Sequence, residues 1–430
     1  MPGREKLRGF RSWENVDVAR ERLLSRIRIP LEVEEISIYE AAGRVLAVDV
    51  VAPADYPPYN RSAVDGYAVR SSDVTGASES NPIPLRVVGT VEAGTKPEGL
   101  KVNEGEAVLI FTGGELPEGA DAVVPVEYVD VEGEYVYVYR SVAKFRNVSL
   151  RGEDFKAREL LAKKGTMIRP WHVAALAQGG FKRVKVFRKL RVGIINTGDE
   201  LYDVVLTQSG GGRIPNSSGP LIASYAEELG CEAEVLGIVG DDEVRIREIL
   251  INALRDHDII VVTGGTSVGG RDVVPEAISS IDGAELVFHG VNLRPGRTAG
   301  AFVVRGKPVL MLSGLPVACL VGLENFLKPV VEKVMGMEPL PRPKVKARLT
   351  RRVANAVGFR SHYRVAVFEE RGELFAEPLR LTGSGILSTL LKGNGILILD
   401  ESLEGVDKDE EVEVMLLGPI YKGRPAFLKW

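Results

Sequence analysis

Hydrophobic positions in the middle of the chain follow two alternating patterns. Unbroken β-branched runs such as 259–262 alternate with stretches whose apolar residues recur at helical spacing, such as 244–255. An unbroken apolar run is typical of a strand that is buried on both faces of a parallel sheet. Strands that alternate with helices predict a doubly wound parallel α/β domain, which we assign to residues 187–337.

The pattern changes on both sides of this domain. Short alternating runs separated by glycine and proline turns predict a small inserted β-domain over 53–147. Residues 1–52 and 148–186 then form one N-terminal domain, which the insertion interrupts. A linker with three prolines leads into a second β-rich domain over 344–430.

Several individual elements can be predicted from local signals. Ser12 can cap a helix that begins at Trp13, and Pro30 ends it. Residues 45–51 have the composition of a strand. An apolar stretch over 317–335 predicts one long helix.

Composition narrows the class of protein. The chain has 430 residues and a net charge of −4, so we expect several domains and no bulk attraction to nucleic acid or an anionic membrane. Cys231 and Cys319 have no C-x-x-C spacing, which argues against a thiolate metal site. With no signal peptide and no apolar run of about 18 residues, we expect a cytoplasmic protein.

Polar and glycine residues gather at the ends of four predicted strands. In a doubly wound sheet these ends share one rim, where ligands bind. The turns contain Thr197, Gly198, Asp199 and Glu200; Gly240 and Asp241; Gly264, Gly265, Thr266 and Ser267, followed by Asp272; and Ser313 with Gly314.

The chemistry of this rim suits a phosphorylated ligand. Glycines let backbone N–H groups approach an anion, and the hydroxyls of Thr266 and Ser267 add donors. Asp241 and Asp272 suit Mg²⁺, which prefers a few carboxylates. The glycine stretch is neither a P-loop nor a dinucleotide fingerprint, and an ordinary tight turn is the alternative.

Arg294 and Arg297 flank a Pro-Gly turn. Two such guanidinium groups can bind an oxyanion bidentately, although a solvated basic loop would have the same sequence. No G-x-S-x-G motif is present, and we interpret the four histidines as mostly structural. These features favour phosphoryl or anhydride chemistry over acyl transfer.

The order and spacing of seven motifs resemble the molybdopterin molybdenumtransferase family, which includes the MoeA proteins and the E domain of gephyrin. The motifs are P-P-Y-N-R-S-A-V-D-G-Y-A-V (57–69), F-T-G-G-E-L-P-E-G-A-D-A-V-V (111–124), R-G-E-D (151–154), T-G-D-E-L (197–201), G-D-D (240–242), T-G-G-T-S-V-G-G-R-D (263–272) and R-P-G-R (294–297). The resemblance implies a molybdopterin-binding α/β domain, an inserted β-domain and a C-terminal β-barrel.

The resemblance also implies roles for individual residues. Functional polar positions of the family match Asp65, Thr112, Asp154, Glu200, Asp241 and Asp272, and the last two would hold Mg²⁺. Residues that would bind the cofactor substrate are Thr197, Gly198, Gly264, Gly265, Thr266, Ser267, Arg294, Arg297, Arg364 and Ser384. Molybdate would lie near Arg294, Arg297 and Ser384.

Three departures from the family pattern occur in the anion site. Arg294 and Arg297 stand where two lysines are usual, Thr298 replaces a proline, and Ser313-Gly-Leu-Pro replaces a Pro-Gly-Asn-Pro turn. An arginine fork differs in geometry from a lysine point charge. The detailed anion geometry therefore stays open from the sequence.

The implied reaction converts adenylylated molybdopterin and molybdate into molybdenum cofactor and AMP. Implied partners are a second copy of the chain, which would bring Asp65 and Thr112 to the rim, and the molybdopterin adenylyltransferase. A sequence with only two glutamines and many charges is typical of heat-adapted proteins, so tungstate is an alternative oxyanion. Two rival functions are adenylylation of molybdopterin, which uses the same α/β fold, and a scaffold role.

Overall fold

The computed structural model describes residues 13–207, 211–265, 273–379 and 383–428. The chain divides into two compact units, and each is described by itself. The first holds residues up to Glu34, Gly43–Val45 and the chain from Val186, and the second holds Glu35–Ala42 and Leu46–Lys185. Among the described residues, no helix combines the length and the apolarity that crossing a membrane requires.

A six-stranded sheet forms the centre of the first unit. Its order is β16 (Glu232–Val239), β13 (Arg191–Thr197), β17 (Ile259–Thr263), β21 (Lys307–Leu312), β20 (Gly300–Val304) and β18 (Ala284–His289). The first four strands are parallel, as the alternating pattern predicts, but β20 runs antiparallel to both of its neighbours, β21 and β18. A two-residue turn joins β20 to β21, and so short a connection can only reverse the chain. The predicted all-parallel sheet is therefore mixed at one edge.

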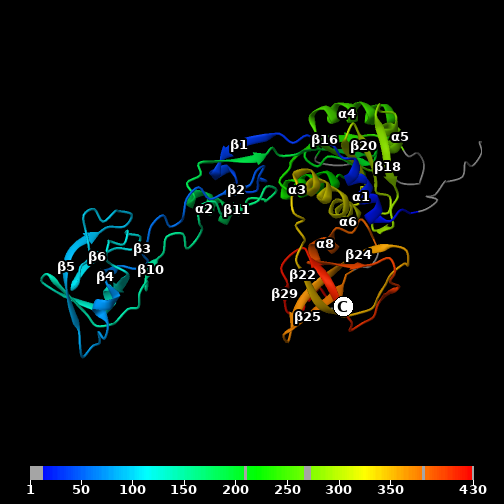
Figure 1. The fold of residues 1–430 in the computed structure, drawn as a ribbon. Coiled ribbons are helices and arrows are strands. Elements are labelled where there is room, and N and C mark those ends of the chain that lie inside the picture. The colour runs from blue at the N-terminus through cyan, green and yellow to red at the C-terminus, as the bar shows by residue number, and fades with distance from the viewer. Residues whose placement is uncertain (1–12, 208–210, 266–272, 380–382, 429–430) are drawn as a thin grey trace, which may run out of the picture. The chain divides into compact units, whose positions relative to one another are not determined.

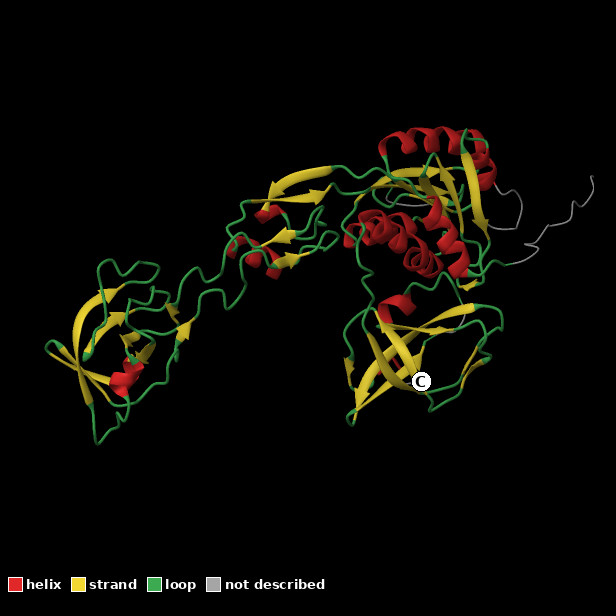
Figure 2. Ribbon diagram, in the orientation of Figure 1, coloured by secondary structure: helices red, strands yellow, loops and turns green. Residues whose placement is uncertain are grey.

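Helices cover both faces of this sheet (Figures 1 and 2). Helices α4 (Glu243–Asp256) and α5 (Val273–Ser279) pack on one face, where their apolar side chains share a core with β17 and β21. On the other face lie α3 (Ser218–Glu228) and α6 (Pro316–Gly322), with α1 (Val16–Arg26) beside β18 and β20. All five residues of β17 are buried, which explains its unbroken β-branched run.

Three local predictions differ from the structure. Helix α1 begins at Val16 rather than Trp13, because the Asn15 side chain accepts hydrogen bonds from the amides of Asp17 and Val18; Ser12 lies outside the described residues. The predicted helix over 317–335 contains a π-helical turn, Leu323–Leu327, between α6 and α7 (Lys328–Met335). Only β2 (Val50–Val51) forms within the predicted strand over 45–51.

The C-terminal domain is a closed five-stranded barrel in the first unit. Its strands are β24 (Arg360–Glu370), β25 (Glu373–Pro378), β22 (Lys344–Leu349), β28 (Glu411–Leu416) and β26 (Gly395–Leu399), and pairing of β24 with β26 closes it. Smaller elements around it are β23 (Val353–Ala354), α8 (Ser388–Lys392), β27 (Gly405–Val406) and β29 (Tyr421–Lys422).

One short strand connects the α/β domain to this barrel. Strand β19 (Leu293–Arg294) pairs in parallel with the beginning of β24, so that Arg294 lies opposite Ser361. The pairing makes the barrel wall and the Pro-Gly turn after Arg294 neighbours. Strands β14 (Leu201–Tyr202) and β15 (Ile214–Pro215) form a two-stranded pair beyond the rim of the sheet.

The second unit contains the inserted β-domain. A six-stranded sheet has the order β7 (Ala122–Pro125), β4 (Gly66–Val69), β6 (Glu106–Ile110), β5 (Ile83–Val91), β9 (Tyr135–Val138) and β8 (Val129–Glu132). The remaining elements are β3 (Arg61–Ser62), β10 (Val148–Ser149), β11 (Leu160–Ala162) and α2 (Pro170–Gln178). Strands β1 (Val33–Ser37) and β12 (Arg183–Phe187) pair where the chain passes between the units.

Candidate functional site

The predicted rim is formed by the carboxyl ends of four neighbouring parallel strands. Thr197 pairs with Val239 of β16, and Asn196 pairs with Thr263 of β17. Thr263 in turn pairs with Leu312 of β21. The turns that follow these strands therefore begin side by side, although their segments are far apart in the sequence.

Two glycines of the central turn are required by close backbone packing. Gly264 has φ +90°, and a Cβ there would lie 2.1 Å from the carbonyl oxygen of Thr197. Gly265 has φ +57°, and its Cβ would lie 2.7 Å from Cγ2 of Val274. No larger residue fits either position without a shift of the rim. The glycines keep the turn thin, so that backbone N–H groups can reach a ligand.

A buried hydrogen-bond network supports the rim from below. The Asn196 side-chain Nδ2 donates to the Thr263 hydroxyl at 2.6 Å, and the Asn216 side-chain Nδ2 donates to the Asn196 side-chain Oδ1 at 2.9 Å. Asn216 also accepts from the Gly219 amide at 3.1 Å in the first turn of α3. Buried polar groups that are paired in this way hold neighbouring elements in one arrangement. No local sequence signal marks this network, because its members come from three separate segments.

Carboxylates cluster at the β13–β16 side of the rim. A Cβ on Gly240 would lie 2.5 Å from Oδ1 of Asp199, and one on Gly198 would lie 2.6 Å from Oε2 of Glu200. Burial raises the pKa of Asp241, and the charges of Asp199 and Glu200 raise it further. A bound cation would relieve this repulsion between carboxylates.

The described residues do not complete a metal site on their own. Within residues 13–428, apart from the stretches left undescribed, no three His, Cys, Asp or Glu side chains group closely enough to hold a metal ion. Asp272, the predicted partner of Asp241, lies outside the described residues, as do Thr266 and Ser267.

Opposite the glycine turn lies the turn that carries the two arginines. Arg294 ends β19, and its position is set by the pairing with Ser361. The backbone carbonyl of Arg297 accepts a hydrogen bond from the Val291 amide at 3.0 Å, which closes the turn. Both arginines line the same pocket and are exposed to solvent.

The barrel supplies a third arginine. Arg364 on β24 is 3% exposed. Its Nε donates to the Thr389 hydroxyl at 3.1 Å and its Nη1 to the His362 carbonyl at 3.2 Å. Burial lowers the pKa of Arg364, yet a guanidinium group stays charged at any working pH. The backbone of Ser384 accepts from the Val317 amide at 3.0 Å, so the barrel segment is tied to the start of α6.

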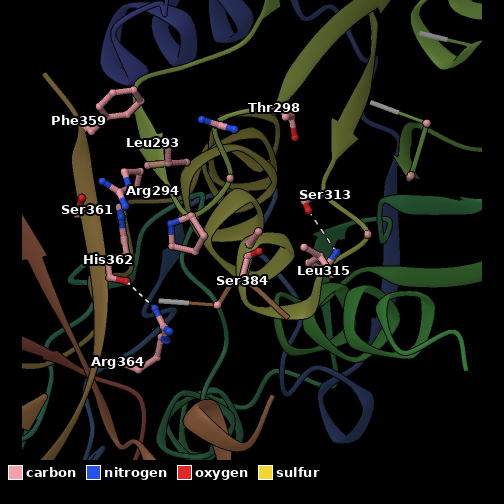
Figure 3. A pocket seen from close by; sticks show the side chains of 18 of the residues that line it. Leu293, Arg294, Thr298, Ser313, Leu315, Phe359, Ser361, His362, Arg364 and Ser384 are labelled. Atoms are coloured by element: carbon pink, nitrogen blue, oxygen red, sulfur yellow. Dashed lines mark hydrogen bonds between the residues drawn. The ribbon is translucent and has the colours of Figure 1, made fainter. Parts of the chain in front are cut away.

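These parts enclose a pocket of about 780 Å³ within the first unit. In Figure 3, Arg294, Ser361, His362 and Arg364 lie along one side of it, and Ser313 and Leu315 lie on the other. The predicted site residues that line it are Thr197, Glu200, Gly264, Gly265, Arg294, Arg297, Arg364 and Ser384. Gly198 and Asp241 belong to the same rim but do not line the pocket.

The lining residues that sequence reasoning missed include Phe359, Ser361 and His362. His362 was interpreted as structural, and burial lowers its pKa to about 4, so the ring is neutral near pH 7. No local signal marks these positions, since their place in the pocket depends on the pairing of β19 with β24.

The other predicted residues lie in the second unit. The Thr112 amide and hydroxyl donate to Oδ1 of Asp65 at 2.8 and 2.7 Å. Pairing of Gly66 with Ile110 brings these two loops together. Asp154 is exposed, and its amide donates to the Tyr56 carbonyl at 3.2 Å. The structure thus joins Asp65 with Thr112 but leaves both in a different unit from the pocket.

Comparison with known proteins defines the class. The chain matches the models of the MoeA N-terminal region (domain I and II) over residues 14–180, of the "Probable molybdopterin binding domain" over 193–333, and of the MoeA C-terminal region (domain IV) over 346–417. It is a three-region protein of molybdenum cofactor biosynthesis, and the finer division into four domains stays a prediction.

Individual relatives agree with this class. A putative molybdopterin biosynthesis protein of Methanocaldococcus jannaschii is 38% identical over 90% of this chain and 92% of its own length. The molybdopterin molybdenumtransferase of Staphylococcus epidermidis is 34% identical over the same shares. The crystal structure of the Pyrococcus horikoshii molybdopterin biosynthesis moeA protein superposes with a TM-score of 0.80 at 35% identity, covering 94% of this chain and all of that one. The chain belongs to the MoeA family of molybdopterin molybdenumtransferases.

Proposed function

We propose that this enzyme inserts molybdate, or alternatively tungstate, into adenylylated molybdopterin and releases AMP in a Mg²⁺-dependent reaction. The observation that carries the proposal is the pocket in which a glycine rim faces three arginines, Arg294, Arg297 and Arg364. One wall suits phosphate oxygens and the other suits a second, separate anion. A reaction that joins a nucleotide-linked substrate to an oxyanion needs both.

The glycine rim would hold the nucleotide end of the substrate. Gly264 and Gly265 leave the backbone open to phosphate oxygens, and the buried network beneath keeps the turn in place. The Thr197 hydroxyl is already committed to the Thr263 carbonyl at 3.2 Å, so it supports the turn. Thr266 and Ser267 would complete the contacts.

The arginine wall would hold the oxyanion. Guanidinium groups donate in pairs to tetrahedral oxyanions, and Ser384 offers a hydroxyl beside them. Molybdate and tungstate have the same charge and shape, so these contacts would discriminate poorly between them. The wall would keep the oxyanion next to the dithiolene sulfurs of the substrate.

Mg²⁺ would be held by Asp241 and Asp272. Bound there, the ion would neutralise the phosphate oxygens of the linkage that breaks. Glu200 lines the pocket at the end of the rim where Mg²⁺ would bind, and it would orient the substrate. The raised pKa of Asp241 supports this assignment, because a carboxyl with carboxylate neighbours gains most from a cation.

Asp65, Thr112 and Asp154 would act on the same substrate from a second copy of the chain. They lie in a different compact unit from the pocket, and the family resemblance implies a site shared across a homodimer. The molybdopterin adenylyltransferase would supply the substrate in the cytoplasm. Adenylylation by this chain itself is less well supported, because that reaction needs no barrel wall.

The decisive experiment is an AMP-release assay. Purified protein is mixed with adenylylated molybdopterin, Mg²⁺ and either sodium molybdate or sodium tungstate, and AMP and mature cofactor are quantified. We expect both products only when all components are present. AMP release that is independent of any oxyanion, or consumption of ATP with molybdopterin, would favour the adenylylation alternative. Absence of turnover with a stable complex would favour a scaffold.

A further inference from the structure

The segment that leads into helix α1 and forms its first residues contacts both the arginine turn and the start of β24. Residues 13–17 come from the start of the described chain, the turn 294–297 follows β19, and 359–361 begins the barrel strand β24. All three belong to the first compact unit. Their contacts form a junction that the proposed function does not use.

Asn292 is the centre of this junction. It is 8% exposed, and three of its polar groups are hydrogen-bonded, two to the segment 14–16 and one to the start of β24. Its amide donates to the Glu14 carbonyl at 2.8 Å, and its side-chain Oδ1 accepts from the Val16 amide at 3.0 Å. Its backbone carbonyl accepts from the Arg360 amide at 2.8 Å. Asn292 therefore fixes the start of the arginine turn against both α1 and β24.

A charged cluster forms a second connection between α1 and β24. Arg360 donates to both carboxylate oxygens of Asp17, at 2.9 and 2.6 Å, and to Glu401 through Nε at 3.2 Å. Asn15 also donates to Glu401 at 2.7 Å. The Arg360 hydrogen bond is the main cause of the lowered pKa of Asp17, so this carboxylate is charged at neutral pH. A bidentate pair fixes direction as well as distance.

Aromatic contacts extend the junction to the oxyanion side chains. The Arg297 guanidinium carbon lies 5.5 Å from the centre of the Trp13 ring, and that ring lies 5.9 Å from Phe359. Phe359 and Arg297 both line the pocket. A shift of residues 13–17 would thus change the packing of the Arg297 side chain.

We propose that residues 13–17 are a positioning element, in which the Asp17–Arg360 ion pair and Asn292 hold the turn 294–297 in register with β24 and so set the affinity for the oxyanion. The proposal rests on the proposed function, because it assumes that Arg297 binds the oxyanion. Asp17 and Arg360 touch no substrate and act through the arginine turn. A purely stabilising role would change unfolding without changing oxyanion affinity.

Trp13 provides a direct readout. Replacing the other two tryptophans, Trp171→Phe and Trp430→Phe, leaves Trp13 as the only one in the chain. Sodium molybdate alone is titrated into this full-length background while Trp13 emission is followed, and AMP binding is measured separately. The variants are Asp17→Asn, Arg297→Ala and, as a matched control, Asp282→Asn, which removes a carboxylate from an exposed ion pair with Arg305.

We expect Asp17→Asn to raise the half-saturating molybdate concentration by about five-fold or more, since small displacements of a binding group are costly. The AMP affinity of Asp17→Asn and the half-saturating molybdate concentration of Asp282→Asn should both stay within about two-fold of the values for the single-tryptophan background. Arg360→Lys keeps the positive charge but cannot donate to both oxygens of Asp17. Its half-saturating molybdate concentration should therefore be raised as in Asp17→Asn.

Two different results would separate the positioning role from the oxyanion site itself. If Arg297→Ala weakens molybdate binding and Asp17→Asn does not, the positioning element is refuted and the proposed function stands. If Arg297→Ala has no effect, or molybdate produces no saturable change, the oxyanion pocket itself is wrong and the positioning role falls with it. Should Asp17→Asn fail to fold, Glu401→Gln removes the other carboxylate of Arg360, and an unchanged titration there overturns the proposal.

Discussion

Thr112 donates two hydrogen bonds to a single carboxylate oxygen of Asp65, one from its amide and one from its hydroxyl. The hydroxyl bond is the largest cause of the lowered pKa of Asp65, and the amide bond is the next. The two residues lie on different loops of the inserted domain, and the pairing of β4 with β6 makes them neighbours.

Thr112→Val should move the acid limb of the pH–rate profile to higher pH. The hydroxyl bond favours the charged carboxylate, so its loss raises the pKa of Asp65 toward the ordinary value near 3.9. Activity that needs ionised Asp65 would then be lost earlier as the pH falls. The measurement is AMP release from pH 3 to 7, with Thr95→Val as the control because the Thr95 hydroxyl donates to the Glu92 carbonyl within its own turn. An acid limb unmoved in Thr112→Val would show that ionised Asp65 is not needed.

Arg297→Ala should weaken oxyanion use and spare the nucleotide. A charge-assisted hydrogen bond contributes about 1.5–3 kcal/mol, so half-maximal AMP release should need roughly ten-fold or more oxyanion. Molybdate and tungstate should both be affected. Arg247→Ala, on the exposed side of α4, is the control. Equal oxyanion requirements in Arg297→Ala and wild type would move the anion site toward Arg364 and Ser384.

Asp241→Asn should raise the Mg²⁺ concentration needed for turnover, and Asp272→Ala should abolish Mg²⁺-dependent turnover. Because the pKa of Asp241 is raised, protons compete with Mg²⁺ at a higher pH than for an ordinary carboxyl. Mg²⁺ affinity should therefore fall as the pH drops through that raised pKa. Both variants should fold normally, since Asp241 is exposed, and circular dichroism checks this. Wild-type Mg²⁺ dependence in both would place the ion elsewhere.

Asp258→Asn should destabilise the first unit. Arg188 donates to both oxygens of Asp258 at 2.6 and 2.8 Å, and the Arg191 amide donates at 2.9 Å. Asp258 is 5% exposed. Its loss would leave the half-buried Arg188 guanidinium without this carboxylate and should lower the free energy of unfolding by about 3 kcal/mol. Glu32→Gln is the matched control, because Glu32 is the exposed partner of the same arginine at 3.8 Å and should contribute less than about 1 kcal/mol.

The same ion pair predicts a pH dependence of stability. Burial alone would raise the pKa of Asp258, but the Arg188 bonds and the Arg191 amide lower it overall. The folded-state pKa is therefore below the unfolded value near 3.9. The stability that Asp258 contributes is fully present above the unfolded-state pKa and is lost as the pH falls through the folded-state pKa. The difference in unfolding free energy between wild type and Asp258→Asn, measured with denaturant, should be constant well above pH ~3.9 and should shrink as the pH falls below that value.

The protein should be a homodimer, because Asp65 with Thr112 and the arginine pocket belong to different compact units. Light scattering gives the mass directly. Mixing an Asp65→Asn chain with an Asp272→Ala chain, each expected to lack turnover, should restore part of the activity, since one of the two shared sites would then be intact. A fully active monomer, or mixtures that never regain activity, would contradict a shared site.

The sequence alone determined the features that depend on local physics. The β-branched run of β17 identified a strand buried on both faces, and the glycines after it identified a turn that larger residues cannot occupy. The motif order identified the family. Such signals are local because periodicity records which face of an element is buried, and positive φ is a property of single residues.

Tertiary structure decided which of these local features meet. Leu293 and Arg294 pair with the first residues of β24, and this pairing brings Ser361 and His362 into the pocket wall. The junction at Asn292 also depends on contacts between distant segments, since its side chain accepts from Val16 and its carbonyl from Arg360. No periodicity encodes such contacts, because their free energy comes from surfaces that come together only when the whole domain folds.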